Sequence, residues 1–257
     1  MTSHLARADT PSVLVAKGLT RRFGALVAVD AVDIALNIGE LHAVIGPNGA
    51  GKSTLTNLLS GEFPPTSGSL HLHGADVAGW PSWRLARAGI GRSFQRTNVM
   101  RTMTVIENVR LAAQARLTPG RRSLRLAAAE PALRLAAEAA LGRVGLSAMS
   151  ERIAATLSHG QLRGLEIAMA LAGGPSVLLL DEPLAGMGPE ESERLAELLR
   201  ALAGDHAVML IEHDMDVVFQ VADVVTVMVD GRVIERGPPS HIRASARVRD
   251  AYLGHAA

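Results

Sequence analysis

A glycine-rich segment near residue 50 has the residue types that bind an anion. Residues 46–53 read Gly-Pro-Asn-Gly-Ala-Gly-Lys-Ser and match the pattern G-x-x-x-x-G-K-[ST] at every fixed position. Glycines let successive backbone N–H groups converge on phosphate oxygens, and a following helix adds its positive end. Lys52, one of only two lysines, can reach the β- and γ-phosphates, and the Ser53 hydroxyl suits Mg²⁺. The residues predicted to bind a nucleotide are Gly46, Pro47, Asn48, Gly49, Ala50, Gly51, Lys52, Ser53 and Thr54.

Two adjacent acids form a second candidate element. Residues 177–183 read Val-Leu-Leu-Leu-Asp-Glu-Pro, a buried strand that ends in carboxylates. This is the Walker B arrangement, which places Asp181 beside the metal and Glu182 where it orients or deprotonates the attacking water. On its own, such a strand more often ends in a solvated turn. The phosphate loop upstream favours the catalytic interpretation.

The elements that must position these groups alternate between strands and helices. Residues 32–38 show the period-2 alternation of a half-buried strand, and a helix is predicted over 53–59. Acids that follow Pro189 predict another helix start, and Asp230–Gly231 indicates a hairpin. Short apolar runs typical of buried strands occur at 41–45, 177–180, 208–211 and 224–229. Interleaved strands and helices predict a largely parallel sheet covered on both faces.

The middle of the chain, about 84–155, is rich in Ala, Leu, Arg and Glu and predicts a helical insertion. Helical periodicity is clearest over 130–144, and residues 118–122 indicate an exposed loop. Arginines in two stretches are expected on solvated faces, with lipid binding as the less favoured alternative. They are Arg84, Arg87, Arg92, Arg121, Arg122 and Arg125.

Composition limits the class of protein. The 257 residues are 48% hydrophobic and 20% charged, which excludes a disordered chain. A net charge of +1 is far from the strongly basic balance expected of a nucleic-acid-binding protein. Zero cysteines exclude thiol catalysis and zinc–thiolate sites. The longest uncharged apolar stretch, Ile167–Leu180, is broken by Gly173, Gly174 and Pro175, so no bilayer span is expected. No apolar signal segment is expected at the N-terminus either.

The segment Leu157-Ser-His-Gly-Gln161 resembles the signature Leu-Ser-Gly-Gly-Gln of the ATP-binding-cassette (ABC) ATPases. In that family the signature begins a helix and closes over the γ-phosphate of ATP held by a partner subunit. The resemblance implies such contacts for Ser158, Gly160 and Gln161, with a helix that begins near Gln161. His159 replaces the first glycine, a departure not expected to remove the phosphate contact.

The resemblance extends to four further positions. It implies that Gln95 is the glutamine that contacts Mg²⁺ and senses the permease, and that His213 is the switch histidine at the γ-phosphate. It implies that Phe23 stacks on adenine, although a core phenylalanine is an alternative. Gly188 stands where the family usually has an acid before the proline, so communication there must use backbone or neighbouring groups.

The resemblance spans about residues 13–253 and implies an α/β P-loop NTPase cassette. Its sheet is mainly parallel and flanked by helices, with an antiparallel β subdomain and a helical insertion. One domain over 1–257 is expected, and its parts are a nucleotide-binding core at 13–94 and 160–240, a helical signature subdomain at 95–159 and a C-terminal helix at 241–257. The implied cofactors are ATP and Mg²⁺, with metal contacts from Ser53, Gln95 and Asp181, and the implied catalytic residues are Glu182, His213 and Gln95.

Finer strings resemble the branched-chain amino-acid uptake branch, and urea and amide uptake ATPases are closely similar. The strings occupy 165–168, 181–187, 211–216 and 251–254. They imply an ATPase that powers import at the cytoplasmic face of the membrane. Its implied partners are a homologous or identical cassette, a transmembrane permease and, indirectly, a periplasmic binding protein. A lipid or lipopolysaccharide exporter and, less favoured, a nucleic-acid-linked ATPase are the alternatives. Residues 102–107 are the candidate permease surface, although Val105 and Ile106 fit a core equally well.

Overall fold

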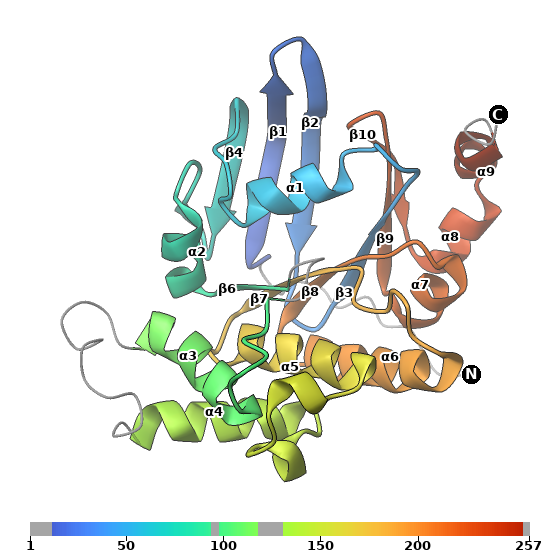
Figure 1. Ribbon diagram of the computed structural model, residues 1–257. Helices are drawn as coiled ribbons and strands as arrows, with labels where there is room; N and C mark the ends of the chain where they lie inside the picture. Colours follow the sequence, from blue (N-terminus) through green and yellow to red (C-terminus); the bar gives the residue numbers. More distant parts are fainter. Residues whose placement is uncertain (1–11, 94–97, 118–130, 254–257) are drawn as a thin grey trace.

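The computed structural model describes residues 12–93, 98–117 and 131–253, and two sheets organise them (Figure 1). The central sheet has the order β10-β9-β3-β8-β7-β6, with parallel neighbours except for β10, which pairs antiparallel with β9. Its strands are β3 (Leu41–Ile45), β6 (Ile90–Arg92), β7 (Val177–Asp181), β8 (Ala207–Ile211), β9 (Val224–Val229) and β10 (Arg232–Gly237). The predicted mainly parallel sheet is confirmed.

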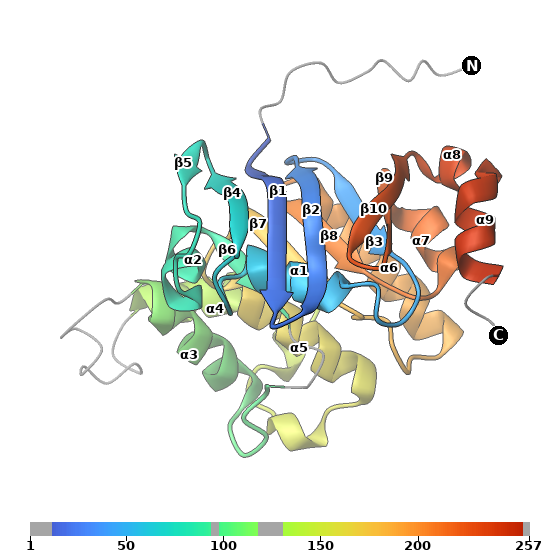
Figure 2. The same cartoon turned by 90° about the horizontal axis from the view of Figure 1, so that it is seen from above.

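The second sheet is antiparallel, with the order β2-β1-β4-β5. Figure 2 shows these strands side by side above α1. Its strands are β1 (Leu14–Phe23), β2 (Leu26–Leu36), β4 (Ser67–Leu72) and β5 (Ala75–Asp76). Helix α1 (Lys52–Leu59) packs its buried Leu55, Leu58 and Leu59 into the cluster between the two sheets. The helix that follows the glycine-rich loop is therefore fixed on both sides.

Strand alternation divides the apolar residues between two layers. In β7, Val177 and Leu179 join the cluster around α1, whereas Leu178 and Leu180 face the helices on the other side. Those helices are α3 (Val105–Leu117), α4 (Pro131–Arg143), α5 (His159–Leu171) and α6 (Pro189–Ala203), with short 3-10 turns at Ser147–Met149 and Ala154–Thr156. The expected helical insertion is thus present and shares its core with the central sheet.

The C-terminal part differs from the single helix expected over 241–257. Two short helices follow β10, and Ser245 between them has an extended backbone (φ −71°, ψ 119°) that interrupts the helical hydrogen bonds. These are α8 (Pro239–Ala244) and α9 (Ala246–Leu253), which pack with α7 (Met215–Val221) against β3 and β9. Helix α2 (Ser82–Ala88) completes the fold. None of the helices in the described ranges is both long and apolar enough to span a membrane.

Candidate nucleotide-binding site

The glycine-rich loop connects β3 to α1 and passes close to two other strands. A Cβ atom at Gly46 would lie 2.0 Å from the Met228 carbonyl oxygen, and one at Gly51 would lie 2.3 Å from that of Ala28. Gly51 also has a left-handed backbone (φ +95°), which side chains disfavour. Both ends of the loop therefore require glycine, which places the intervening N–H groups around a small concave space.

A hairpin from the C-terminal half supports this loop. The N–H of Gly231, in the turn between β9 and β10, donates to the Ala50 carbonyl at 3.1 Å. The Gly231 carbonyl in turn accepts from the N–H of Asp30 at 2.8 Å. Arg232 closes the arrangement with two hydrogen bonds to one carboxylate oxygen of Asp30, at 2.9 and 2.7 Å. The predicted turn at Asp230–Gly231 is thus part of the wall of the site.

Lys52 begins α1 with its side chain folded back into its own loop. Its Nζ atom donates to the carbonyl oxygens of Gly46 at 2.6 Å and Pro47 at 2.9 Å, and the residue is only 6% exposed. Burial lowers the pKa of Lys52, an effect that the carboxylates of Glu182 and Asp181 oppose. The ammonium group therefore lies at the base of the loop, partly desolvated and beside two acids.

Asp181 ends β7, and its charge acts on Lys52. It is 3% exposed, and its Oδ1 atom has no hydrogen-bond partner among the described residues. Burial raises the pKa of Asp181, as does the charge of Glu182. A buried carboxylate oxygen of this kind requires a cation or a donor. Mg²⁺ fits that oxygen, because at phosphate sites this ion takes one or two carboxylates besides phosphate oxygens. The Ser53 hydroxyl as a second ligand stays a prediction.

Glu182 and His213 meet because their strands are neighbours. Strands β7 and β8 are paired in parallel, and Glu182 and His213 follow their carboxyl ends. The Glu182 N–H donates to the Ile211 carbonyl at 2.9 Å, and the Glu182 carboxylate contacts Nε2 of His213. Glu182 also has a positive φ of +48°, a conformation that costs energy for a residue with a side chain. The two groups can therefore act together on one water molecule.

A cleft of about 480 Å³ contains most of the residues predicted to bind the nucleotide. Its lining includes Lys52, Glu182, His213 and the loop residues at 48–51, 53 and 54. Residues 26–28 of β2 and the hairpin turn at 230–231 complete it, and neither segment was predicted to belong to the site. Gln95 lies outside the described residues.

Phe23 is absent from the described lining of this cleft. Its ring, 42% exposed, meets that of Phe63 edge to face at 5.6 Å, and the Arg21 guanidinium lies 4.6 Å above it. Leu26, which is 65% exposed, lines the cleft on the same hairpin. A purely core role for Phe23 is wrong, because the ring is exposed, and adenine stacking stays a prediction.

The signature segment lies away from the cleft, at the start of α5. Ser158 is the N-cap, so the helix begins at His159, two residues before the predicted start. The Ser158 hydroxyl accepts from the Gln161 N–H at 3.3 Å, and Gln161 Oε1 accepts from the Ser158 N–H at 3.0 Å. Together with Gly160 these residues line a separate hollow of about 430 Å³. The arrangement presents a helix N-terminus at the surface.

The prediction for Arg92 is wrong, and the two alternatives left open for Val105 and Ile106 are now distinguished. Arg92 is half-buried and donates to Ser60 Oγ at 2.6 Å and Asn57 Oδ1 at 2.7 Å, so it fixes α1 to β6 and is not on a solvated face. Val105 and Ile106 are 0% and 5% exposed, so in residues 102–107 they belong to the core. Their burial follows from the position of α3 against α4 and α5.

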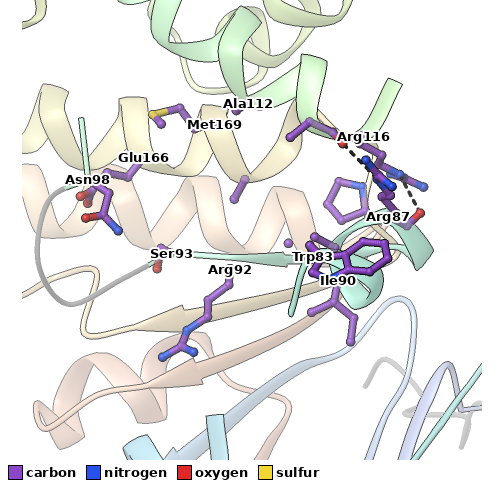
Figure 3. A pocket seen from close by; sticks show the side chains of 16 residues that line it. Trp83, Arg87, Ile90, Arg92, Ser93, Asn98, Ala112, Arg116, Glu166 and Met169 are labelled. Carbon is purple, nitrogen blue, oxygen red and sulfur yellow. Dashed lines mark hydrogen bonds between the residues drawn. The ribbon is translucent and has the colours of Figure 1, made fainter. Parts of the chain in front are cut away.

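A second cavity, of about 450 Å³, lies between α2, β6, α3 and α5 (Figure 3). Trp83, 60% exposed, and Arg87 lie at one end beside Arg116 of α3, and Glu166 and Met169 of α5 lie toward the other. Glu166 accepts from Arg163 at 2.8 Å, and both side chains are buried. The lining is mainly apolar with charges at both ends.

Comparison with known proteins identifies the family of the chain. The family model described as "ABC transporter" matches residues 29–185, which include the phosphate loop, the signature and both acids. The chain belongs to the ABC transporter family. That membership confirms the expected cassette, which binds ATP or ADP and couples ATP hydrolysis to transport.

Relatives of this cassette match it along nearly all of their length. The high-affinity branched-chain amino acid transport ATP-binding protein LivG of Salmonella typhimurium is 40% identical over 253 residues, covering 95% of this chain and 98% of that protein. The corresponding BraF of Pseudomonas aeruginosa is 38% identical with the same coverage. The ADP conformation of MJ1267, an ATP-binding cassette of an ABC transporter, has a TM-score of 0.85 at 29% identity, covering 95% of this chain and 100% of that one.

Proposed function

We propose that this cassette is the ATP-hydrolysing subunit of an importer for branched-chain or related amino acids. The observation that carries the proposal is the 40% identity with LivG over 95% of the chain, since LivG is named for that transport. The strings at 165–168, 181–187, 211–216 and 251–254 support the same branch.

The geometry supports a separate role for each group in the cleft. The loop N–H groups and Lys52 bind the phosphates, Glu182 accepts a proton from the attacking water, and His213 holds the carboxylate of Glu182 in place. Mg²⁺, held by Ser53 and Asp181 with Gln95 as a further ligand, would supply positive charge at the phosphates. Phosphate binding and proton acceptance depend on side chains and N–H groups of the protein.

The second half of each site comes from another cassette in this proposal. Ser158, Gly160 and Gln161 lie outside the cleft, so they act on a nucleotide bound by a homologous or identical partner subunit. The solved dimer of the cassette MJ0796 bound to ADP and Pi, with a TM-score of 0.72 at 25% identity, supports such pairing. We assign 13–94 and 160–240 to the nucleotide-binding core, 95–159 to the signature subdomain and 241–257 to the C-terminal segment.

The cavity beside α2 is the surface that we assign to the permease. It is open, mainly apolar and lined by both the central sheet and the helical insertion, so an inserted segment would touch both. A membrane permease bound there places the cassette at the cytoplasmic face of the membrane, and a periplasmic binding protein would act through the permease.

The test is to purify the complex that forms around this chain, reconstitute it in liposomes and measure which solute stimulates ATP hydrolysis. Leucine, isoleucine or valine with a cognate binding protein should stimulate turnover and accumulate inside. Stimulation by urea or short amides instead would assign the chain to that related branch. Stimulation by a lipid or lipopolysaccharide, with no binding protein in the complex, would contradict import.

A further inference from the structure

The loop that follows Glu182 is contacted by two side chains from other parts of the fold. We call residues 183–188, which connect β7 to α6, the connecting loop. Gly186 and Gly188 have no side chains, and a Cβ atom at Gly188 would meet nothing within 4 Å. Leu184 is buried in the core and Met187 packs against it, and backbone groups of Leu184 and Ala185 provide two further attachments.

Glu212 provides one attachment. This carboxylate, 4% exposed, accepts from the Leu184 N–H at 2.8 Å through Oε1 and from the His213 N–H at 3.3 Å through Oε2. One buried side chain thus holds the start of the connecting loop and the backbone of the switch histidine. Because His213 contacts Glu182, the catalytic acid is held at the same point.

His159 provides the other attachment. Its Nε2 atom lies 3.1 Å from the Ala185 carbonyl oxygen, and because a carbonyl only accepts, the ring nitrogen donates. The same ring packs 3.5 Å from the position that a Cβ atom of Gly186 would occupy. His159 stands where the signature of the family has a glycine, which offers no side-chain donor.

We propose that Glu212 and His159 are positioning residues that fix the connecting loop between them and couple the signature of a subunit to its own Glu182–His213 pair. The inference rests on the proposed nucleotide chemistry and adds the two attachments. A shift of α5, whose N-terminus serves the partner's nucleotide, is transmitted through Ala185 and Leu184 to Glu212, and from there to His213 and Glu182.

The test uses full-length protein and measures kcat and KM for ATP without transported solute. His159→Phe keeps a ring but removes the donor, and His159→Gln restores a donor. We expect His159→Phe to lower kcat about ten-fold, because the connecting loop loses one of its attachments. KM should stay within about two-fold, because the phosphate loop is unchanged. His159→Gln should recover most of kcat. Wild-type kcat in His159→Phe, or equal loss in both variants, would overturn the proposal.

Glu212→Gln keeps the shape of the side chain but loses the bond to one of the two N–H groups, and about the same fall in kcat is expected. The double variant His159→Phe/Glu212→Gln should be no more than about two-fold slower than the slower single variant, since either change releases the same loop. If the double variant instead lost kcat by the product of the two single losses, the two residues would act independently, which would contradict the proposal.

The matched control is His241→Phe, because His241 also bonds through Nε2, to Glu235 at 3.0 Å, but on α8. It should leave kcat unchanged. His159 is exposed, so the melting temperature of its variants should match the wild type. Basal ATP hydrolysis involves no solute, so a negative result in the amino-acid transport assay leaves this test intact.

Discussion

The Nζ atom of Lys52 lies 2.6 Å from the carbonyl oxygen of Gly46, so the loop closes around the charge of its own lysine. A bound phosphate would compete with that carbonyl for the ammonium group. The ammonium group bonds to carbonyl oxygens, so it does not occupy the neighbouring N–H groups. The strength of nucleotide binding therefore depends on a cation that is already placed before the anion arrives.

Lys52→Ala should weaken ATP binding by at least about ten-fold, because a charge-assisted contact to phosphate is lost. Binding of a fluorescent ATP analogue measures the change. The only other lysine, Lys17, is exposed on β1 and gives the control. Equal affinity in Lys52→Ala and Lys17→Ala would contradict the assigned phosphate loop.

Glu182→Gln should reduce ATP turnover by about a hundred-fold or more, because an amide cannot accept the proton of water. ATP binding should persist, and the variant should elute as a dimer in size-exclusion chromatography with ATP. Glu190→Gln, an exposed acid in the first turn of α6, is the control and should keep turnover. Normal hydrolysis by Glu182→Gln would remove the glutamate from the catalytic role.

Asp181 should make stability depend on pH. Burial and the charge of Glu182 raise the pKa of Asp181, so the folded protein binds this proton more tightly than the unfolded chain. Its contribution to the free energy of unfolding therefore falls as pH rises from the unfolded value of about 3.9 through the raised folded value. Asp181→Asn cannot ionise and should melt at a higher temperature than the wild type at pH 7.

Each kcal/mol regained in Asp181→Asn corresponds to about 2–4 °C in a domain of this size. The difference between the two proteins should shrink as the pH falls, because the wild-type carboxyl then takes up a proton and loses its buried charge. Thermal unfolding from pH 4 to 8 is the measurement. A difference in melting temperature that is constant across that range would show that ionisation of Asp181 is not its cause.

Gly51→Ala should abolish nucleotide binding and lower the melting temperature. The new methyl group would lie 2.3 Å from the Ala28 carbonyl oxygen, so β2 or the loop must move. Gly24→Ala is the matched control, because Gly24 also has a positive φ, +59°, but nothing within 4 Å of the added Cβ. It should cost only about 1 kcal/mol and keep ATP binding. Equal effects in both variants would show that backbone strain, not the close contact, accounts for the loss.

Local chemistry explains why much of the site was predictable. The phosphate loop, Asp181 and His213 each belong to a short string whose residue types match one task, and each follows a strand with a strong apolar signal. Since parallel strands present their carboxyl ends at one edge, the strings also had to meet there. The strand at 224–229 and the helix start at Pro189 were predicted to the residue.

Contacts between distant segments explain what could not be predicted. Glu212 stands in the string at 211–216, yet nothing in that string shows that its carboxylate turns toward Leu184. Likewise Leu26 reads as an ordinary strand residue, and only the pairing of β1 with β2 brings it to the cleft. The break at Ser245, by contrast, has a local cause that was missed, because its hydroxyl accepts from the Val248 N–H at 3.4 Å and so caps α9.

The hairpin behind the phosphate loop also has a consequence for synthesis. Asp30 and Arg232 are 202 residues apart, and β3 lies between β8 and β9, which leave the ribosome much later. At about 5–20 residues per second, the glycine-rich loop waits for about 10–40 seconds before its supporting turn exists. A growing chain therefore carries the sequence that binds ATP long before it can retain the nucleotide, and mutations in the last third impair a site encoded in the first.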